Sequence, residues 1–321
     1  MRAQAFDRYG GLDVLDLREL DTPVAEAGQV LVRVAFVTLN PIEWKIRSGM
    51  LASMLPMEFP IILGNEISGV IAQVGAGVEE FQVGDRVAGF VRGRGDAVYV
   101  LSTPDRLAAV PDALSLRRAA TIPQGAETAR RSIDLLQVEP GQTVLVNAAA
   151  GSVGSAAVQM LVGMGATVIG TASAGNHDYL RSLGATPVEY GPHLLTQVAQ
   201  VAPQGIDKAL DGGDRGFVDQ VLTILPPDQI ITIADFSAVG KGVQLANGDP
   251  LALFADSFRA QITLAAQDRF ATQIAAEFAF EDLPAAHTMS EAGHLRGKIL
   301  VKVADLDAEA SAEDTQSGSN S

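Results

Sequence analysis

The sequence predicts an α/β protein in which a β-rich part is followed by a doubly wound parallel sheet. Residues 1 to about 120 contain short valine-rich runs between glycine turns, and residues 116 to 247 alternate apolar strand runs with helical segments. With 321 residues, of which 47% are hydrophobic, the chain can form about two domains with sizeable cores.

The N-terminal part has the pattern of a small barrel or sandwich. The stretch "GQVLVRVAFVTLNP" alternates apolar and polar residues from Val30 to Val37 and stops at Asn40-Pro41. The stretch "GVIAQVGAGVEEFQVGDRVAGFV" carries short valine-rich runs between glycines. Both patterns predict short antiparallel strands joined by tight turns.

The middle of the chain has the pattern of a parallel sheet. The predicted strands are "TVLVNAA", "TVIGTAS", "TPVEY", "GIDKALD" and "QIITIAD", each separated from the next by a helical period. Such alternation implies right-handed crossovers and a sheet covered on both faces. Beyond Asp249, we expect "AQITLAA" (260–266) and "GKILVKV" (297–303) to be strands on either side of a helical "LPAAHTMSEAGH".

Composition argues against several classes of function. A net charge of −15 disfavours binding to nucleic acid or to an anionic membrane. The chain has no cysteine, which excludes disulfides, thiolate metal sites and cysteine nucleophiles. No signal-peptide run or 18-residue apolar segment is found, so we expect a cytoplasmic protein. Residues 304–321 carry five acids and no base and are expected to be a disordered acidic tail.

One segment, "TVLVNAAAGSVGSAAVQMLVGMGA", has the context of a dinucleotide site. A buried strand enters a turn of small residues, and a helix is expected to start near Ser152, where free N–H groups favour a diphosphate. Ala149 replaces the first glycine of the usual fingerprint, which gives the pattern A-x-G-x-x-G. Gly151 would admit the phosphates and Gly154 would allow close packing of helix and strand. The alternative is tight helix packing without a ligand. The candidate cofactor residues in this turn are Ala150, Gly151, Ser152, Val153 and Gly154.

The next strand bears on the choice of cofactor. "TVIGTAS" contains Thr171 and ends at Ser173 with no acidic residue to accept hydrogen bonds from the ribose of NAD. Hydroxyl and amide donors at Ser173 and Asn176 therefore favour NADP. No lysine or arginine stands beside Ser173, although Arg181 follows on the next helix.

Taken together, the chain resembles the zinc-free medium-chain dehydrogenase/reductase superfamily, in its quinone oxidoreductase (zeta-crystallin-like) branch. The segments that carry the resemblance, in order, are "AFDRYGGLDVLDLREL", "VTLNPIEWKIRSGM", "LGNEISGVIAQVGAGVEEFQVGDRV", "AATIP", "PGQTVLVNAAAGSVG" and "SEAGHLRGKILVKV". The resemblance implies a GroES-like catalytic domain formed by residues 1–121 and 251–303, with an inserted Rossmann domain at 122–250 and the active site between them.

The zinc site of zinc-dependent relatives is not matched. In "LGNEISG", Asn65 stands where those relatives have a histidine, and the chain has no cysteine ligand to offer. The four histidines are scattered along the sequence; His287 and His294 could share one helix face, but a plain structural role is the simpler interpretation. No metal is expected.

The resemblance implies hydride transfer from NADPH to the conjugated C=C bond of a quinone or an α,β-unsaturated carbonyl. It assigns Asn40, Trp44 and Thr128 to catalysis. Asn40 and Trp44 could instead be a turn cap and a core residue. Lys45 and Arg47 are further candidates for polarising a carbonyl. Asn40 and Thr128 are also expected to contact the cofactor, together with Tyr190, Asp235, Phe236 and Lys298.

The sequence departs from the family at several positions. Gln124 and Glu127 are polar where relatives are apolar, which suggests a tailoring enoyl reductase of polyketide or other secondary metabolism as an alternative. Asp96 stands where an aromatic residue is common. A third hypothesis is a non-catalytic NADPH-binding protein. A homodimer is expected to form through an exposed edge strand near "IITIADF" or "AQITLAA".

Overall fold

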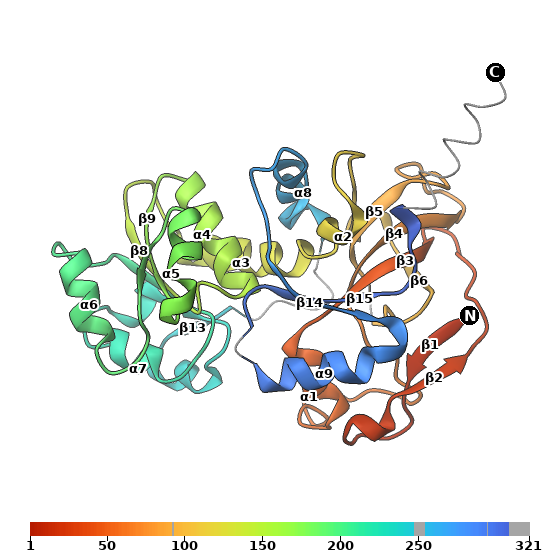
Figure 1. The fold of residues 1–321 in the computed structure, drawn as a ribbon, viewed down its shortest axis with the longest axis horizontal. Helices are drawn as coiled ribbons and strands as arrows, with labels where there is room; N and C mark the ends of the chain where they lie inside the picture. Colours follow the sequence, from red (N-terminus) through yellow and green to blue (C-terminus); the bar gives the residue numbers. More distant parts are fainter. Residues whose placement is uncertain (92, 247–253, 294, 308–321) are drawn as a thin grey trace. The chain divides into compact units, whose positions relative to one another are not determined.

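The computed structural model describes residues 1–91, 93–246, 254–293 and 295–307. These residues form two compact units (Figure 1). Within the described part, unit 1 contains residues 1–91, 93–123, 254–293 and 298–307, and unit 2 contains residues 124–246 and 295–297. Most of unit 2 is therefore inserted into unit 1. The boundaries at 121, 250 and 303 stay predictions.

Unit 1 is built on a mixed, mainly antiparallel sheet. The strand order is β14-β15-β3-β4-β5-β7, and β6 also pairs with β3. A separate hairpin is formed by β1 and β2. The strands are β1 (Arg2–Ala5), β2 (Asp16–Glu19), β3 (Val30–Leu39), β4 (Glu66–Val74), β5 (Arg86–Phe90), β6 (Tyr99–Ser102), β7 (Leu107–Ala109), β14 (Ile274–Ala279) and β15 (Lys298–Lys302). The helices are α1 (Pro41–Arg47), α2 (Leu116–Ala119), α8 (Arg259–Ala266) and α9 (Leu283–Ala292).

The long strand β3 organises this sheet. It pairs with β4, β6 and β15, and nearly all of its residues are buried. The strand ends at Leu39 because Pro41, which lacks a backbone N–H, starts helix α1. Helix α9 packs beside α1 (Figure 1). The end of β3 is thereby fixed from several sides.

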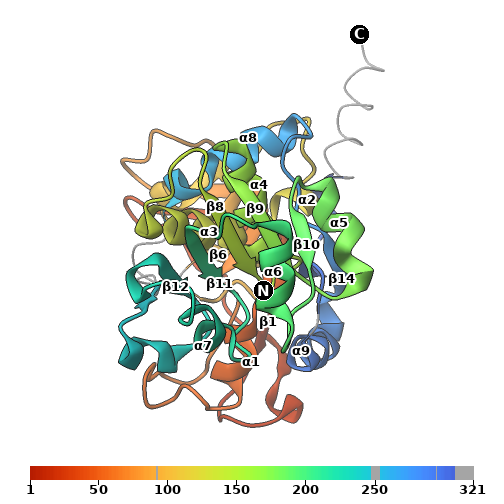
Figure 2. The same cartoon turned by 90° about the vertical axis from the view of Figure 1, so that its left-hand side faces the viewer.

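Unit 2 is the predicted doubly wound sheet. Its strand order is β10-β9-β8-β11-β12-β13, and every pair is parallel. Strands β8 to β12 are labelled in Figure 2. The strands are β8 (Thr143–Asn147), β9 (Thr167–Thr171), β10 (Thr186–Val188), β11 (Lys208–Asp211), β12 (Ile230–Thr232) and β13 (Gln244–Leu245). The helices are α3 (Pro123–Leu136), α4 (Ser152–Gly163), α5 (His177–Ser182), α6 (Leu194–Val201) and α7 (Phe217–Val221).

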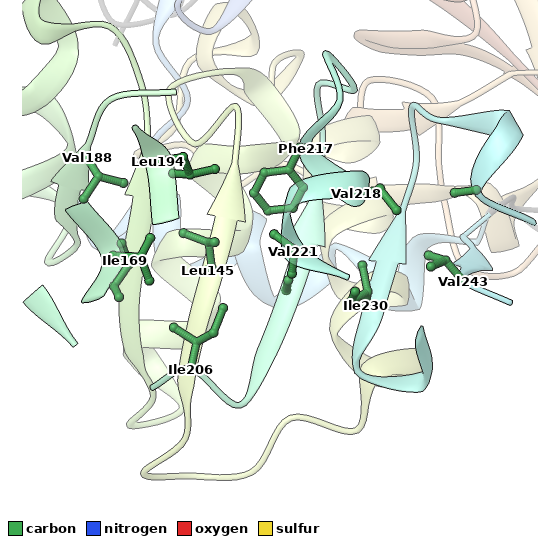
Figure 3. Packing of buried hydrophobic residues seen from close by; sticks show 13 residues of the cluster. Leu145, Ile169, Val188, Leu194, Ile206, Phe217, Val218, Val221, Ile230 and Val243 are labelled. Atoms are coloured by element: carbon green, nitrogen blue, oxygen red, sulfur yellow. The ribbon is translucent and has the colours of Figure 1, made fainter. Parts of the chain in front are cut away.

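The core of unit 2 shows why these runs form a sheet. Leu145 of β8, Ile169 of β9 and Ile230 of β12 pack in one cluster with Leu194 of α6 and Phe217 of α7 (Figure 3). The residues on either side of Leu145 are equally buried but lie outside this cluster, so β8 is covered on both faces. Continuous apolar runs, rather than alternating ones, are what such strands require.

Three expectations are corrected. Residues 260–266 form helix α8, not a strand, with Gln261, Ile262 and Ala265 buried at helical spacing. The edges of the parallel sheet are β10 and β13, so β12 of "IITIADF" is covered on both sides. The start of the predicted tail is ordered, because Asp307 accepts hydrogen bonds from Arg86 and from the first N–H of α2. Residues 308–321 lie outside the described residues.

None of the helices in the described ranges is long and apolar enough to cross a membrane.

Candidate functional site

The turn after β8 has the geometry that its sequence predicted. Ala148 adopts a left-handed conformation with φ 55°, and the N–H of Gly151 donates to the Ala148 carbonyl at 3.0 Å. Helix α4 begins at Ser152. A Cβ at Gly154 would lie 2.3 Å from the Ala148 oxygen and 2.7 Å from the Ala149 Cα. Gly154 is therefore required for the close contact between helix and turn.

A hydrogen-bond network below the turn ties four strands together. Asn147 donates to Asp211 at 2.8 Å and accepts from the Thr171 hydroxyl at 2.6 Å. The Thr232 hydroxyl donates to the other Asp211 oxygen at 2.7 Å. The Ala148 N–H donates to Thr171. Because these polar groups are buried and paired, they hold the turn rigidly. Thr171, predicted as a cofactor residue, is thus part of the support of the turn.

The turn fits a dinucleotide diphosphate on two counts. The Ser152 hydroxyl oxygen is buried and has no hydrogen-bond partner among the described residues. A Cβ at Gly151 would meet only the Ala148 oxygen, at 3.3 Å, so no side chain covers this part of the backbone. Helix α3 approaches from the other side, where a Cβ at Gly125 would lie 2.7 Å from the Ser152 hydroxyl. A small-residue cradle with an unpaired donor suits a phosphate.

Of the predicted adenosine residues, Ser173 and Tyr190 are exposed and Asn176 is half-buried. Ser173 lies on the surface, and its hydroxyl accepts from the Asn176 amide at 3.2 Å. Tyr190 is also exposed, with the Arg215 guanidinium 5.6 Å from its ring centroid. No acidic side chain pairs with Ser173 or Asn176 among the interactions of the described residues.

The predicted nicotinamide residues of unit 2 differ from one another. Asp235 caps the short helix that follows β12 and accepts from the N–H and hydroxyl of Ser237; the hydrogen bond from the Ser237 side chain lowers its pKa. Phe236 is exposed. Asp235 therefore shapes this loop, while Phe236 leaves an aromatic ring free on the surface of the unit.

Thr128 lies on α3 in a chain of polar contacts. Its hydroxyl accepts from Gln124 at 3.0 Å and donates to Glu127 at 3.2 Å. Arg131 binds the same carboxylate in an ion pair of 2.7 Å. Because Glu127 is buried, its charge needs a partner, and Arg131 is that partner.

One cation of unit 2 was missed by the sequence analysis. Residues 295–297 belong to unit 2, and Gly297 forms a parallel β-bridge with Gly151. The neighbouring Arg296 places its guanidinium 5.6 Å from the ring centroid of Tyr179 on α5. Arg296 stands more than 120 positions after Ser173 in the sequence, so no local pattern could have pointed to it.

In unit 1, the ends of three strands bring Asn40 and Lys298 together. Leu39 pairs with Ile299, so the next residues, Asn40 and Lys298, face each other. The Lys298 ammonium donates to the side-chain oxygen of Asn40 at 2.5 Å and forms an ion pair with Glu66 at 2.7 Å. The Thr38 hydroxyl also donates to Glu66. Both charges are almost fully buried, at 3% and 0% side-chain exposure.

Two buried carboxyl groups stand beside this pair. Glu43 accepts from the N–H of Asn40 at 2.5 Å and from the amide of Asn65 at 3.4 Å. Burial, with the charge of Asp96, raises the pKa of Glu43 to about 8. Burial raises the pKa of Asp96 to about 7. Glu43 thus carries a proton at neutral pH. The Asn-x-x-Glu spacing of a capping box is the sequence signal that could have drawn attention to it.

Of the other candidates on α1, Trp44 and Lys45 are half-buried and Arg47 is buried. The indole N–H of Trp44 has no hydrogen-bond partner among the described residues, and Lys45 lies 5.7 Å from its ring centroid. Arg47 is buried and forms an ion pair with Glu291 of α9. His287 is fully buried, and its burial, with the charge of Arg47, lowers its pKa to about 3. Arg47 is therefore a structural residue. His294 lies outside the described residues.

No group of three or more histidine, cysteine, aspartate or glutamate side chains within the described ranges could hold a metal ion. At the position where Asn65 replaces a histidine, its side-chain oxygen accepts from the N–H of Gly93.

Two family models match the chain in the order of the fold. Residues 26–109 match the alcohol dehydrogenase GroES-like domain, and residues 183–301 match the zinc-binding dehydrogenase family. The chain belongs to the medium-chain dehydrogenase/reductase superfamily. The predicted fold class, a GroES-like domain with a parallel-sheet Rossmann domain, is confirmed.

The relatives lie in the quinone oxidoreductase and enoyl reductase branch of this superfamily. A chloroplastic quinone-oxidoreductase homolog from Spinacia oleracea is 33% identical over 198 residues, 59% of this chain and 60% of that protein. A trans-enoyl reductase from Aspergillus japonicus is 32% identical over 196 residues, 55% of this chain and 56% of that protein. These matches span less than two thirds of either relative.

Among solved structures, the quinone oxidoreductase from Coxiella burnetii has a TM-score of 0.82 and 29% identity, covering 95% of this chain and 99% of that one. The families that this chain matches contain oxidoreductases that bind a nicotinamide cofactor.

Proposed function

We propose that this protein is an NADPH-dependent, zinc-independent oxidoreductase that reduces the conjugated C=C bond of a quinone or an α,β-unsaturated carbonyl. The observation that carries the proposal is the turn between β8 and α4, where Ser152 offers an unpaired hydroxyl at an open glycine backbone. When bound there, NADPH supplies the hydride.

A preference for NADPH over NADH is supported by two features of unit 2. No carboxylate stands at the end of β9 beside Ser173, and the next acid, Asp178, is paired with Arg181. Arg296 lies over the ring of Tyr179 and precedes the bridge between Gly297 and Gly151, and we infer that it is the cation that meets the 2′-phosphate. A guanidinium is the side chain that best matches a phosphate group.

The residues of unit 1 fit the other half of the reaction. Reduction of an enone places negative charge on the carbonyl oxygen, and neutral N–H donors stabilise such charge without attracting water into the site. The side-chain amide of Asn40 and the indole N–H of Trp44 are neutral donors of this kind, at the start of α1 and one turn further along it. The carbon next to the carbonyl then takes a proton from solvent, since the reaction needs no dedicated acid.

The test is a pair of titrations followed by a substrate panel. Nicotinamide fluorescence measures the affinity for NADPH and for NADH, and loss of NADPH absorbance reports turnover of quinones and enones. We expect NADPH to bind at least about tenfold more tightly, equal to 1.4 kcal/mol, and Arg296→Gln to reduce that ratio. A protein that binds neither nucleotide, or reduces no acceptor in a broad panel, contradicts the proposal.

A second candidate is an enoyl reductase of secondary metabolism. It is favoured by the similarity to the trans-enoyl reductase from Aspergillus japonicus and by the polar Gln124 on α3. Greater activity on a polycyclic enone than on simple quinones would select it. Tight NADPH binding without turnover of any acceptor would instead select the non-catalytic hypothesis.

We further propose a cytoplasmic homodimer that pairs through the edge strand β13, which covers β12 in the parallel sheet. Light scattering in solution measures the mass; a monomer contradicts this part of the proposal.

A further inference from the structure

The ammonium of Lys298 is held by two partners within unit 1. It is 3% exposed, donates to Asn40 at 2.5 Å and pairs with the fully buried Glu66 at 2.7 Å. Glu66 accepts a further hydrogen bond from Thr38. The positive charge is therefore compensated inside the unit, in contrast to the exposed lysines and arginines that usually bind phosphates.

This contact fixes the orientation of the Asn40 amide. An ammonium group donates three hydrogen bonds and accepts none, so the Asn40 atom that faces it must be the carbonyl oxygen. The amide nitrogen then points the other way. That nitrogen is buried and has no hydrogen-bond partner among the described residues. Asn40 as a whole is partly exposed. Leaving a buried amide NH₂ group without an acceptor costs free energy, so binding an acceptor atom there is favourable.

In the part of the chain that the structure describes, no acceptor pairs with the Asn40 amide nitrogen. Glu43 accepts from the backbone N–H of Asn40 and from the amide of Asn65. Burial raises the pKa of Glu43 to about 8. The Asn40 amide nitrogen is therefore available to an acceptor atom that comes from outside the protein.

We propose that Lys298 is a positioning residue and not a cofactor ligand: by holding the oxygen of Asn40, it presents the Asn40 N–H group to the substrate oxygen on which negative charge develops. This inference rests on the proposed function, because the oxygen belongs to the quinone or enone. It also replaces the sequence-based assignment of Lys298 to the cofactor.

Asn40→Asp tests the donor directly. The aspartate keeps the shape of the side chain and gains charge attraction to Lys298, so the fold is retained while the N–H donor is lost. We expect kcat to fall by about 10²–10³, the usual effect of removing one such donor, with NADPH affinity and Tm close to those of the wild type. Affinity for 4-nitrophenolate, an unreactive oxyanion, is expected to fall about tenfold or more, in line with a lost charge-assisted hydrogen bond.

Lys298 is tested by a variant that leaves no unpaired buried charge. The double variant Lys298→Met, Glu66→Gln removes both members of the ion pair. We expect kcat to fall at least about tenfold, as for a side chain that loses its orientation, while NADPH affinity is kept. Lys298→Arg, which still donates, is expected to retain a larger share of kcat than the double variant. Lys302→Met on the same strand is the control, because Lys302 is exposed and pairs only with Asp305.

The outcomes separate this inference from the proposed function. If the wild type reduces enones and Asn40→Asp does so at the same rate, the inference is overturned while the proposed function stands. If the double variant loses NADPH affinity but keeps kcat at saturating cofactor, Lys298 is a cofactor ligand after all. If the wild type reduces no acceptor, the proposed function fails, and 4-nitrophenolate binding to the wild type and to Asn40→Asp still decides whether Asn40 is an oxyanion donor.

Discussion

Two glycines of the nucleotide turn make different demands, and substituting each by alanine separates folding from cofactor binding. At Gly154, the new Cβ would lie 2.3 Å from the Ala148 oxygen and 2.7 Å from the Ala149 Cα. Both are backbone atoms that cannot rotate away. At Gly151, φ is −74° and the only contact is 3.3 Å, so alanine fits with little strain.

The expected magnitudes follow from this geometry. Gly154→Ala should cost about 1–3 kcal/mol through overpacking, which lowers Tm by roughly 2–4 °C per kcal/mol for a chain of this size. Gly151→Ala should change Tm by less than about 2 °C, since alanine suits an extended backbone. Its methyl group would nevertheless occupy the approach of the diphosphate, so NADPH affinity should fall at least about tenfold.

Differential scanning fluorimetry and NADPH titration measure the two effects on the same preparations. Equal stability of Gly154→Ala and the wild type would refute the packing argument. Undiminished NADPH binding by Gly151→Ala would refute the placement of the diphosphate.

Three further predictions concern stability. The pKa of His287 is about 3 in the folded protein and 6.5 ordinarily, so the unfolded chain takes up the proton at a higher pH. The folded state therefore loses stability as the pH falls from 6.5 towards 3. His287→Gln should lessen that loss in urea titrations. Glu43 behaves oppositely: its folded pKa of about 8 lies above the ordinary 4.5, so stability falls as pH rises between these values, by up to about 1.4 kcal/mol per pH unit. Glu43→Gln should flatten this slope, and an unchanged slope would exclude a buried protonated carboxyl. Thr232→Val removes a hydroxyl donor from buried Asp211 and should cost about 1–3 kcal/mol; a neutral result would mean that the network does not support the turn.

The sequence was sufficient to predict most of unit 2 because each of its elements has a local signature. Apolar runs such as 143–147 and 167–171 are too short for core helices and are separated by long helical periods. The run 260–266 shows the limit of this method. Its Ile262 and Leu264 alternate as in a strand, yet burial of Gln261, Ile262 and Ala265 follows a helix. Seven residues are too few for periodicity to decide between the two.

The candidate site was predictable only where it is local. The turn at 148–154 could be found because one continuous segment supplies its glycines, its hydroxyl and its helix. The contact between Asn40 and Lys298 spans 258 positions and depends on the pairing of β3 with β15. The contact between Arg296 and Tyr179 likewise joins distant parts of the sequence, because residues 295–297 return to unit 2 after the chain has passed through unit 1. Such contacts require the tertiary structure.

The most direct test of the central claim is a crystal structure of the protein with NADPH. The account predicts that the diphosphate lies against the backbone N–H groups at the start of α4, within hydrogen-bonding distance of the Ser152 hydroxyl. A complex in which the nucleotide lies elsewhere, or in which side chains fill the turn at Gly151, would contradict it.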